Sequence, residues 1–311
     1  MLVRIFFAGT PDIAAAVLQQ LIDSPHEVVG VLTRPDAPIG RRRTLTPSPV
    51  AALAEGHGIP VVRATRVTDE VVDAVAAKAP ELGVVVAYGA LLPDRLLAVP
   101  EHGWINLHVS LLPAWRGAAP VQRAIAAGDD PLGLSVIQVT SELDAGDILT
   151  QRPIAGLERA TAGQVLARMG DEGAQDVLAA VDALAAGTAH PTAQTGPVSI
   201  AAKLDRDFGR LDWSLPTRDV FNRWRAATPE PGAWSTLDDA TFKVVEVALI
   251  DDPEALPAEQ ASPGSVVLHR KRVLAATGDG WLQLVTVQPA GRAAMPARAW
   301  INGRQSEAVF A

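Results

Sequence analysis

The chain has 311 residues, of which 48% are hydrophobic and 20% are charged, and its formal net charge is −8. This composition leaves room for two domains and excludes general disorder, because there is enough apolar material for a core. The sequence has no cysteine, which excludes disulfides, thiolate metal sites and a cysteine nucleophile, and its negative charge argues against non-specific coating of nucleic acid.

Membrane attachment is not expected. No apolar run approaches the roughly 20 uncharged residues that a membrane helix needs. The first residues, Met1 to Ala8, lack the basic and apolar regions of a signal peptide. These features predict a cytoplasmic protein, and a monomer is the default expectation for its oligomeric state.

The first half of the chain alternates short apolar runs with helical patterns. Strands are expected at residues 3–8, 27–33, 82–87, 104–109 and 134–140. Helices are expected at 13–22, 67–79, 118–127 and 161–186, where apolar residues recur at helical spacing, and Gly187 is a suitable stop for the last of them. This βαβα order predicts a mostly parallel sheet covered by helices on both faces.

The pattern changes after residue 187. Residues 188–198 are polar, contain two prolines and show no period, which predicts a linker. A short helix at 216–227 and strands at 241–250, 264–269, 272–276 and 281–287 then predict a small β-barrel or sandwich. The expected division is a first domain at 1–187, a linker at 188–205 and a second domain at 206–311.

Several common motifs are missing from the sequence. The first predicted strand leads into Gly9-Thr10-Pro11 and not into a G-x-G-x-x-G dinucleotide fingerprint. The sequence also has no phosphate-binding P-loop, no paired histidines at metal-binding spacing and no serine-hydrolase elbow. No metal is therefore expected.

The predicted strand at 104–109 carries two polar side chains. The strand period of two places Asn106 and His108 on one face. An amide and an imidazole are poor core residues, and they stand at the carboxyl end of a strand, where open α/β sheets bind ligands. A histidine that is merely satisfied by a neighbour remains the alternative.

A second polar stretch, residues 143–147, follows the predicted strand at 134–140. It holds Asp144 and Asp147 on either side of Gly146. Two acids in a tight loop suit proton transfer or ligand binding. An ordinary turn, in which an aspartate bonds its own backbone, remains equally open from this stretch alone.

Together these stretches resemble the folate-dependent formyltransferase family. Its signature is Asn-x-His-x-Ser-Leu-Leu-Pro with a downstream aspartate, and this chain has Asn106, His108, residues 110–113 and Asp144 at those places. Segments at 8–12, 116–120, 143–147, 212–214, 276–280 and 288–291 resemble the branch of the family that formylates methionyl-tRNA. The resemblance implies a Rossmann-like formyltransferase domain and a C-terminal barrel similar to an OB fold that binds tRNA.

The same resemblance implies a reaction. The formyl group of 10-formyltetrahydrofolate, which leaves as tetrahydrofolate, is transferred to the α-amine of initiator methionyl-tRNA. Asn106 and His108 would donate hydrogen bonds to the charge that develops on the formyl oxygen. Asp144 would hold and charge His108 and accept or relay a proton. The folate pocket would include Ser110, Leu111, Leu112 and Pro113.

Contacts to the tRNA are expected from basic side chains. Arg41, Arg42 and Arg43 lie in a Pro/Gly-rich loop that matches a basic insertion of the resembling family, although a short basic run is often merely solvated. Further candidates in the second domain are Lys203, Arg206, Arg210, Arg218, Arg223, Arg225 and residues 270–272. Three tryptophans there, Trp213, Trp224 and Trp234, are expected in the core.

Three other functions compete with this interpretation. Folate-dependent enzymes that act on glycinamide ribonucleotide or on amino sugars differ after Leu-Leu-Pro, where this chain reads Arg116-Gly117-Ala118-Ala119-Pro120. An inactive RNA-binding module would show a broken Asn106, His108 and Asp144 set. A hydrolase that releases formate from the same carrier would need an assay without acceptor to be told apart.

Overall fold

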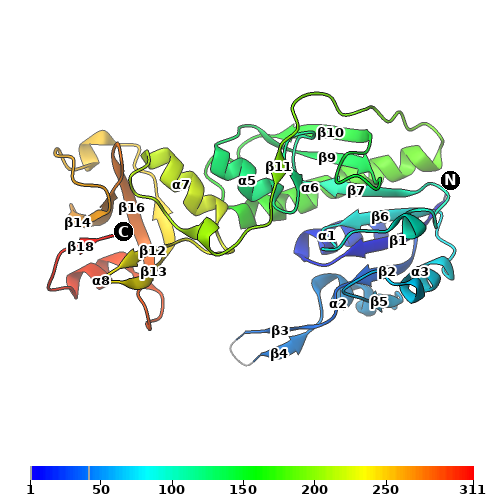
Figure 1. Ribbon diagram of the computed structural model, residues 1–311, viewed down its shortest axis with the longest axis horizontal. Coiled ribbons are helices and arrows are strands. Elements are labelled where there is room, and N and C mark those ends of the chain that lie inside the picture. The colour runs from blue at the N-terminus through cyan, green and yellow to red at the C-terminus, as the bar shows by residue number, and fades with distance from the viewer. Residues whose placement is uncertain (1, 41–42) are drawn as a thin grey trace. The chain divides into compact units, whose positions relative to one another are not determined.

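The structure is a computed structural model that describes residues 2–40 and 43–311 (Figure 1). The chain forms two compact units. Unit 1 consists of Met1–Pro120, Pro131–Ala155 and Val165–Ala202, and unit 2 consists of Val121–Asp130, Gly156–Gln164 and Lys203–Ala311. Two short stretches that precede residue 165 therefore belong to the second unit. No described helix is long and apolar enough to cross a membrane.

Unit 1 is built on a seven-stranded sheet with the order β10-β9-β7-β6-β1-β2-β5. Five neighbouring strands are parallel: β1 (Arg4–Gly9), β2 (Glu27–Thr33), β5 (Val61–Arg63), β6 (Leu82–Val86) and β7 (Trp104–His108). Two antiparallel strands, β9 (Leu132–Gln138) and β10 (Ile148–Ile154), complete one edge. The expected mostly parallel sheet is thereby confirmed.

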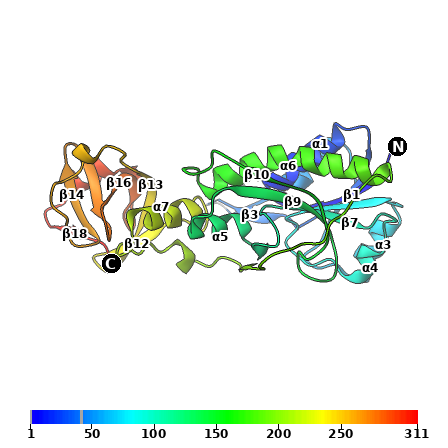
Figure 2. The same ribbon diagram turned by 90° about the horizontal axis from the view of Figure 1, so that it is seen from above.

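Helices cover both faces of this sheet (Figure 2). Helices α1 (Asp12–Ile22) and α6 (Ala162–Ala185) lie on one face, and α3 (Asp69–Ala76) and α4 (Asp94–Leu97) lie on the other. Close packing needs glycine at two points. A Cβ at Gly173 of α6 would lie 2.8 Å from Leu107, and a Cβ at Gly83 of β6 would lie 2.1 Å from the ring of Trp104. The buried Trp104 ring therefore fills the space that glycine leaves in β6.

Several elements of unit 1 were not expected from the sequence. They are the hairpin of β3 (Ala37–Ile39) and β4 (Thr44–Thr46), α2 (Pro49–Gly56), β5, α4, β10, and the short pair β8 (Arg116–Gly117) and β11 (Ile200–Ala201). Helix α2 begins after Ser48, whose hydroxyl accepts a hydrogen bond from the Ala51 amide at 3.0 Å. Strand β10 is mostly half-exposed and contains Pro153, so it lacks the apolar run that marks the buried strands.

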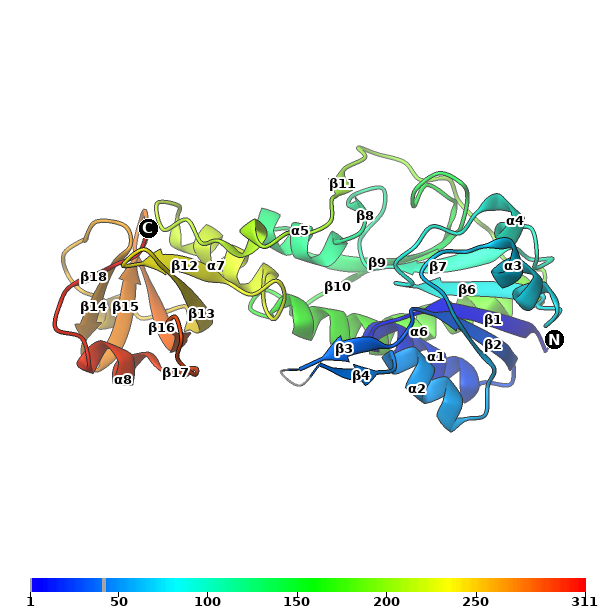
Figure 3. The same ribbon diagram turned by 60° about the horizontal axis from the view of Figure 1, so that its bottom comes forward.

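Unit 2 contains an antiparallel sheet with the order β12-β13-β16-β15-β14-β18, and β17 pairs with β16 (Figure 3). The strands are β12 (Trp234–Leu237), β13 (Ala240–Ala248), β14 (Ser265–His269), β15 (Arg272–Ala276), β16 (Trp281–Gln288), β17 (Met295–Pro296) and β18 (Ala308–Val309). Helices α5 (Pro120–Ala127), α7 (Thr217–Ala226) and α8 (Ala297–Asn302) and two short 3₁₀ turns, η1 (Asp207–Gly209) and η2 (Pro253–Ala255), complete the list of elements.

The sheet of unit 2 closes on itself. Beyond β18, Ala311 exchanges two backbone hydrogen bonds with Thr236 of β12, at 3.3 and 3.0 Å. This contact joins the first and last strands of the order and gives the expected barrel. Inside it, the rings of Trp213 and Phe310 stack with centroids 5.0 Å apart, and Phe242 lies 4.7 Å from Trp300.

The three tryptophans expected in this core have different surroundings. Trp213 and Trp224 are 3% and 6% exposed, as expected. Trp234 is only half-buried. Arginine side chains lie over its outer face, with Arg206 4.9 Å and Arg210 5.9 Å from the ring centroid. The core expectation is therefore wrong for Trp234, which lies half-buried at the start of the short strand β12.

Candidate active site

Three polar side chains meet at the end of β7. Asn106 and His108 lie two residues apart on that strand, and both contact Asp144 from the loop between β9 and β10. The Asn106 Nδ2 atom lies 3.5 Å from Asp144 Oδ1, and His108 Nδ1 lies 3.6 Å from Asp144 Oδ2. The structure thus brings together all three residues that the sequence singled out.

The surroundings of His108 favour the neutral form of its ring. Its side chain is 5% exposed, and Nε2 lies 2.9 Å from the Trp115 carbonyl oxygen. Since a carbonyl oxygen only accepts, Nε2 must carry a hydrogen. Burial lowers the pKa of His108 and outweighs the opposing effect of the Asp144 carboxylate, while Arg116 lowers the pKa further.

The expectation that Asp144 holds and charges His108 meets two opposing effects. The carboxylate raises the pKa of His108, and burial, the larger effect, lowers it. With a hydrogen on Nε2, the neutral ring presents the bare lone pair of Nδ1 to the side where Asp144 lies. A proton arriving at Nδ1 would therefore stand next to the carboxylate.

The Asp144 loop depends on backbone conformations that few residues accept. Asp144 itself has φ of 47°, in the left-handed region that aspartate tolerates better than most side chains. Its Oδ2 accepts a hydrogen bond of 2.8 Å from the Gly117 amide. A Cβ at Gly146 would lie 1.8 Å from the Gln138 carbonyl oxygen, so only glycine fits where the loop folds back on β9.

The predicted linker contributes to this site. In residues 192–201, here called the strap, Thr192 exchanges backbone hydrogen bonds with Ile148 at 2.8 and 2.9 Å. The Ser199 hydroxyl accepts a bond of 2.9 Å from the Trp115 amide. Strand β11 at the end of the strap pairs in parallel with β8, which follows Trp115 (Figure 3). The strap therefore contacts both segments that hold His108 and Asp144 in place.

Gln194 is the strap residue with most contacts to the site. Its Nε2 donates to the carbonyl oxygens of Asp144 and Gly146, both at 2.8 Å. Its Oε1 accepts from Nε and Nη2 of Arg116 at 3.1 and 2.8 Å. Sequence reasoning missed Gln194, because nothing in an aperiodic polar segment distinguishes one amide from its neighbours.

The loop expected to hold folate is braced from within. The Ser110 hydroxyl donates to the Ala114 carbonyl at 2.6 Å, and the Ser135 hydroxyl donates to the Ser110 carbonyl at 2.7 Å. Leu112 donates its amide to Ser135 at 3.2 Å, and its carbonyl accepts from Gln151 at 2.9 Å. Ser110 and Leu112 are each 4% exposed. These two residues therefore shape the loop from the inside.

The other two residues of this loop are half-buried. The Leu111 side chain lies against β9 at Gly133, where an added Cβ would come within 2.3 Å of it. Pro113 follows Leu112 at the turn of the loop. A surface for a ligand at this loop must therefore come from Pro113 and the remaining exposed part of Leu111.

The basic loop of the first half is described only in part. Arg41 and Arg42 lie outside the described residues. Arg43 is exposed, has φ of 50° and donates its amide to the Gly40 carbonyl at 3.1 Å, between β3 and β4. The described residues contain no group of three or more histidine, cysteine, aspartate or glutamate side chains that could hold a metal ion.

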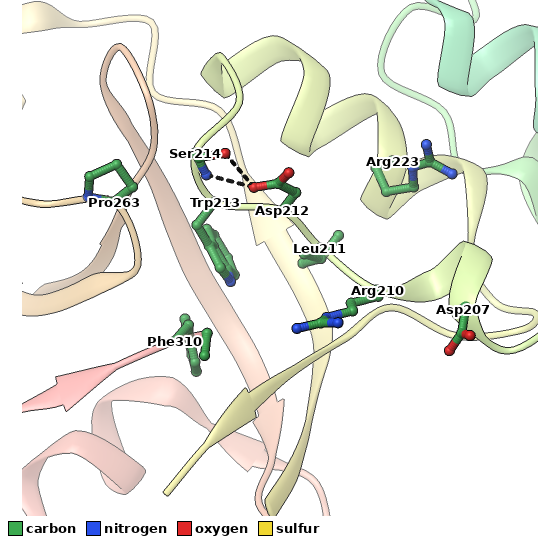
Figure 4. Close-up of a pocket in the computed structure, with 10 residues that line it drawn as sticks. Asp207, Arg210, Leu211, Asp212, Trp213, Ser214, Arg223, Pro263 and Phe310 are labelled. Carbon is green, nitrogen blue, oxygen red and sulfur yellow. Dashed lines mark hydrogen bonds between the residues drawn. The ribbon is translucent and has the colours of Figure 1, made fainter. Parts of the chain in front are cut away.

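Unit 2 carries an open groove of about 600 Å³ (Figure 4). It is lined by Asp207, Arg210, Leu211, Asp212, Trp213, Ser214, Arg223, Pro263, Phe310 and Ala311. Figure 4 shows Asp212 bonded to Ser214, and the side chains of Arg210 and Arg223 pointing in different directions. Arg223 and Arg123 both lie over the Phe208 ring, at 4.6 and 5.0 Å from its centroid.

One arginine of unit 2 is not placed for tRNA. Arg225 is 4% exposed and donates to the side chain of Asn222 at 2.9 Å and to the carbonyls of Leu157 and Ala160 at 3.1 and 3.4 Å. Burial lowers the pKa of Arg225 to about 10. Its expected place on a tRNA path is wrong, because the guanidinium is consumed inside the unit.

Comparison with known proteins gives matches to both halves of the chain. Residues 1–181 match the family described as formyl transferase, and residues 203–305 match the formyl transferase C-terminal domain. The methionyl-tRNA formyltransferase of Paenarthrobacter aurescens (strain TC1) is 47% identical over 300 residues, which cover 96% of each chain. That of Leifsonia xyli subsp. xyli (strain CTCB07) is 47% identical over 307 residues, which cover 99% of each chain.

Solved structures show the same fold at low identity. HypX from Aquifex aeolicus in complex with tetrahydrofolic acid has a TM-score of 0.67 at 19% identity over 97% of this chain and 47% of HypX, so the chain spans about half the length of HypX. The sugar 3N-formyl transferase WlaRD has a TM-score of 0.64 at 15% identity over 94% of this chain and 100% of WlaRD. On its matches to the family and to curated relatives over nearly its full length, the chain belongs to the formyl transferase family, within the group of the methionyl-tRNA formyltransferases.

Proposed function

We propose that this chain transfers the formyl group of 10-formyltetrahydrofolate to the α-amino group of initiator methionyl-tRNA. The observation that carries the proposal is the meeting of Asn106, His108 and Asp144 at the end of β7, in a chain 47% identical to a methionyl-tRNA formyltransferase over 96% of both lengths. The name of that relative supports the acceptor, and the tetrahydrofolic acid of the HypX complex supports the carrier.

The reaction is an acyl transfer between two nitrogens. The α-ammonium of the methionyl ester loses a proton, and its nitrogen lone pair attacks the formyl carbon on N10 of the folate. A new N–C bond forms, the bond from N10 to the formyl carbon breaks, and N10 takes up a proton to give tetrahydrofolate. One proton is released overall, so the site must move protons away from the amine.

We assign this proton transfer to His108 and Asp144. The neutral ring has its lone pair at Nδ1, because Nε2 is engaged with the Trp115 carbonyl. Nδ1 can accept the proton of the attacking amine, and the carboxylate of Asp144, 3.6 Å away, then stabilises the imidazolium. From His108 the proton passes to solvent or to the leaving N10. General-base catalysis of this kind contributes about 100- to 10,000-fold in rate.

Asn106 is assigned to the formyl oxygen. Its Nδ2 carries two hydrogens, and one of them is directed at Asp144 over a long distance of 3.5 Å. The second can donate to the oxygen on which negative charge develops. A donor fixed in this way contributes about 3–4 kcal/mol to a transition state. These steps use side chains of the chain alone, and we propose that no metal takes part.

The folate is proposed to bind against the loop at residues 110–113. The buried residues Ser110 and Leu112 fix the shape of the loop, and Leu111 and Pro113 are more exposed than they are. A braced loop suits a flat ring system that stacks on apolar surface. Since Leu112 already donates its amide to Ser135 and its carbonyl accepts from Gln151, hydrogen bonds to the pterin edge are proposed to come mainly from other groups.

For the acceptor we propose a division of the chain into a catalytic domain at 1–187, a linker at 188–205 and a tRNA-binding domain at 206–311. Arg41, Arg42 and Arg43 are proposed to contact tRNA phosphates, as are arginines of unit 2 that lie over aromatic rings, such as Arg206 and Arg210. The enzyme is proposed to act as a monomer in the cytoplasm.

The direct test is a formylation assay. Purified protein is mixed with 10-formyltetrahydrofolate and initiator Met-tRNA, and formylmethionyl-tRNA is measured, with elongator Met-tRNA and free methionine alongside. Rapid formylation of the initiator alone is the expected outcome. Formate release without transfer, or transfer to small amines only, would refute the acceptor assignment.

A further inference from the structure

The strap contains one side chain with more contacts to the site than its position in the sequence suggests. Gln194 uses every polar position of its amide. Both Nε2 hydrogens go to the carbonyls of Asp144 and Gly146, and Oε1 takes two bonds from Arg116. The amide orientation is thereby fixed, because the flipped amide would set an oxygen against two carbonyl oxygens and an NH₂ group against a guanidinium.

The segments that Gln194 joins are the two that surround the catalytic carboxylate. Asp144 and Gly146 belong to the loop after β9, and Arg116 belongs to β8 beside Gly117, whose amide donates to Asp144 Oδ2 at 2.8 Å. Arg116 is itself anchored, with Nη1 3.4 Å from Glu142 in the same loop. Gln194 therefore spans the backbone that carries Asp144 and the strand that receives its side chain.

The Asp144 backbone needs such a support. Its φ of 47° lies in the left-handed region, which is unfavourable for a residue other than glycine. Without Gln194, the carbonyls of Asp144 and Gly146 would lose the donor that they share. The 3.6 Å separation between Asp144 Oδ2 and His108 Nδ1 would then depend only on the contacts of the Asp144 side chain with Gly117 and Asn106.

We propose that Gln194 is a positioning residue for formyl transfer, which acts by holding the Asp144 loop so that the carboxylate stays beside His108. This inference rests on the proposed function for its effect on turnover. Its geometric content, that Gln194 sets the distance between Asp144 and His108, stands without it. Displacing a catalytic group by about 1 Å can cost about 100-fold in rate.

Two substitutions test the contacts of the Gln194 nitrogen and oxygen separately. Gln194→Met keeps the length of the side chain and removes all four hydrogen bonds. Gln194→Glu keeps an oxygen for Arg116 but turns a second oxygen toward the carbonyls of Asp144 and Gly146. We expect both variants to lower kcat about 10- to 100-fold, with KM for folate and for Met-tRNA unchanged.

A matched control is Gln19→Met on α1. Gln19 donates its Nε2 to the side chain of Asp23 at 3.0 Å, far along the chain from the site residues, and this variant should keep normal turnover. If Gln194→Glu restores the rate that Gln194→Met loses, the residue serves only to hold Arg116, and the proposal is wrong. Equal turnover of Gln194→Met and the wild type would also overturn it.

A second measurement reads the geometry directly. The His108 ring is titrated by NMR, its resonance assigned by its loss in His108→Asn. The charged groups that face it are Asp144, which raises its pKa, and Arg116, which lowers it. In Gln194→Met the carboxylate moves away, so the pKa of His108 should fall below its wild-type value. An unchanged pKa refutes the positioning role.

The two measurements also separate this inference from the proposed function. The titration needs no substrate and gives an answer whether or not formyl transfer takes place. A wild-type protein that formylates nothing refutes the proposed function, while a shifted His108 pKa in Gln194→Met would still support the role of Gln194.

Discussion

At the scale of single residues, the site is organised by what surrounds His108. One ring nitrogen meets a carbonyl oxygen that can only accept, and the other meets a carboxylate. The ring is buried, which favours its neutral form. A neutral ring with its hydrogen on Nε2 leaves a lone pair at Nδ1, whereas a charged ring would be a donor at both nitrogens.

For turnover, the negative charge of Asp144 is expected to matter more than the shape of its side chain. Asp144→Asn keeps an oxygen for the Gly117 amide but cannot stabilise a proton on His108. We expect kcat to fall about 100- to 10,000-fold, with a melting temperature close to that of the wild type. Asp147→Asn, an exposed acid in the same loop, is the matched control. Comparable turnover of the Asp144 and Asp147 variants would contradict the assignment.

The titration of His108 gives a pH prediction. Its pKa in the folded protein is lowered by burial from the ordinary 6.5. The unfolded chain therefore binds this proton first as the pH falls below 6.5, so His108 makes no contribution above 6.5 and destabilises the fold progressively below it. NMR titration should give a midpoint under 6.5, and Asp144→Asn should lower it further. A midpoint at or above 6.5 would contradict this account.

At the scale of elements, the active site is made of loops whose conformations depend on one another. The turn after β9 requires glycine at position 146, since an added Cβ would meet the Gln138 carbonyl at 1.8 Å. The strap then fixes the same turn from a distance of 50 residues along the sequence through Gln194. Local geometry and a long-range contact therefore act on one short segment.

Gly146→Ala is expected to damage both stability and turnover. The backbone must shift to admit the methyl group, at a cost of about 1–3 kcal/mol in the free energy of unfolding, and Asp144 shifts with it. Gly56→Ala is the control, because its Cβ would enter open space in the last turn of α2, where alanine is neutral or favourable. Denaturant unfolding and the formylation assay check both variants, and equal stability of the two would argue against the clash.

Arg225 supports a different junction, within unit 2. It joins α7 to the turn at Leu157 and Ala160 through their carbonyls. Arg225→Leu takes this donor from the Ala160 carbonyl and leaves the Leu157 carbonyl only the Ala160 amide, which should cost about 2–3 kcal/mol of unfolding free energy. Arg218→Leu, an exposed position on the same helix, should cost little. A tRNA-contact role would instead show as lost affinity at unchanged stability.

The sequence predicts the elements in which apolar residues recur at a regular spacing, and it misses the elements without such a pattern. The buried strands and α6 are apolar at regular spacing, so their limits fall within a few residues of the structure. Strand β10 is mostly half-exposed, and β8 and β11 have two residues each, so no pattern marks them. Asn106 and His108 follow from strand alternation, whereas their contact with Asp144 depends on a loop path that only the family resemblance suggested.

The supporting contacts are harder still to predict. The partner of His108 is the Trp115 carbonyl, and backbone groups leave no trace in the residue types. Gln194 lies in a segment whose composition indicates a linker, and its role exists only through contacts with residues far away in the chain. The same limit explains the wrong expectation for Arg225. Its residue type suggests a surface cation, and only the structure shows that it is buried.

At the scale of the whole molecule, the net charge of −8 must be reconciled with a polyanionic acceptor. Attraction then has to come from local basic groups, and such contacts weaken steeply with salt. The loop at Arg41, Arg42 and Arg43 and the arginines over Phe208 and Trp234 are the proposed places.

Salt dependence tests the basic loop. Alanine at Arg41, Arg42 or Arg43 should reduce the slope of log K for tRNA against log salt by about 1 for each phosphate contact that is lost. Turnover at saturating tRNA should change little. Arg168→Ala, which removes an ion pair with Glu172 on α6, should leave the slope as it is. If all three arginines are replaced by alanine and the salt dependence of tRNA binding does not change, the loop is merely solvated.

The two hydrogen bonds between Thr236 and Ala311 have a consequence for how unit 2 recognises another molecule. Sheets with free edges can capture an extended segment of another molecule by adding it as a further strand, and they also risk aggregation there. In unit 2, Thr236 of β12 is bonded to Ala311, which follows β18, so main-chain pairing at that place is already used. A partner of unit 2 cannot add a strand there, and we expect its recognition to depend on side chains, so that substitutions on the surface retune affinity without rebuilding the backbone.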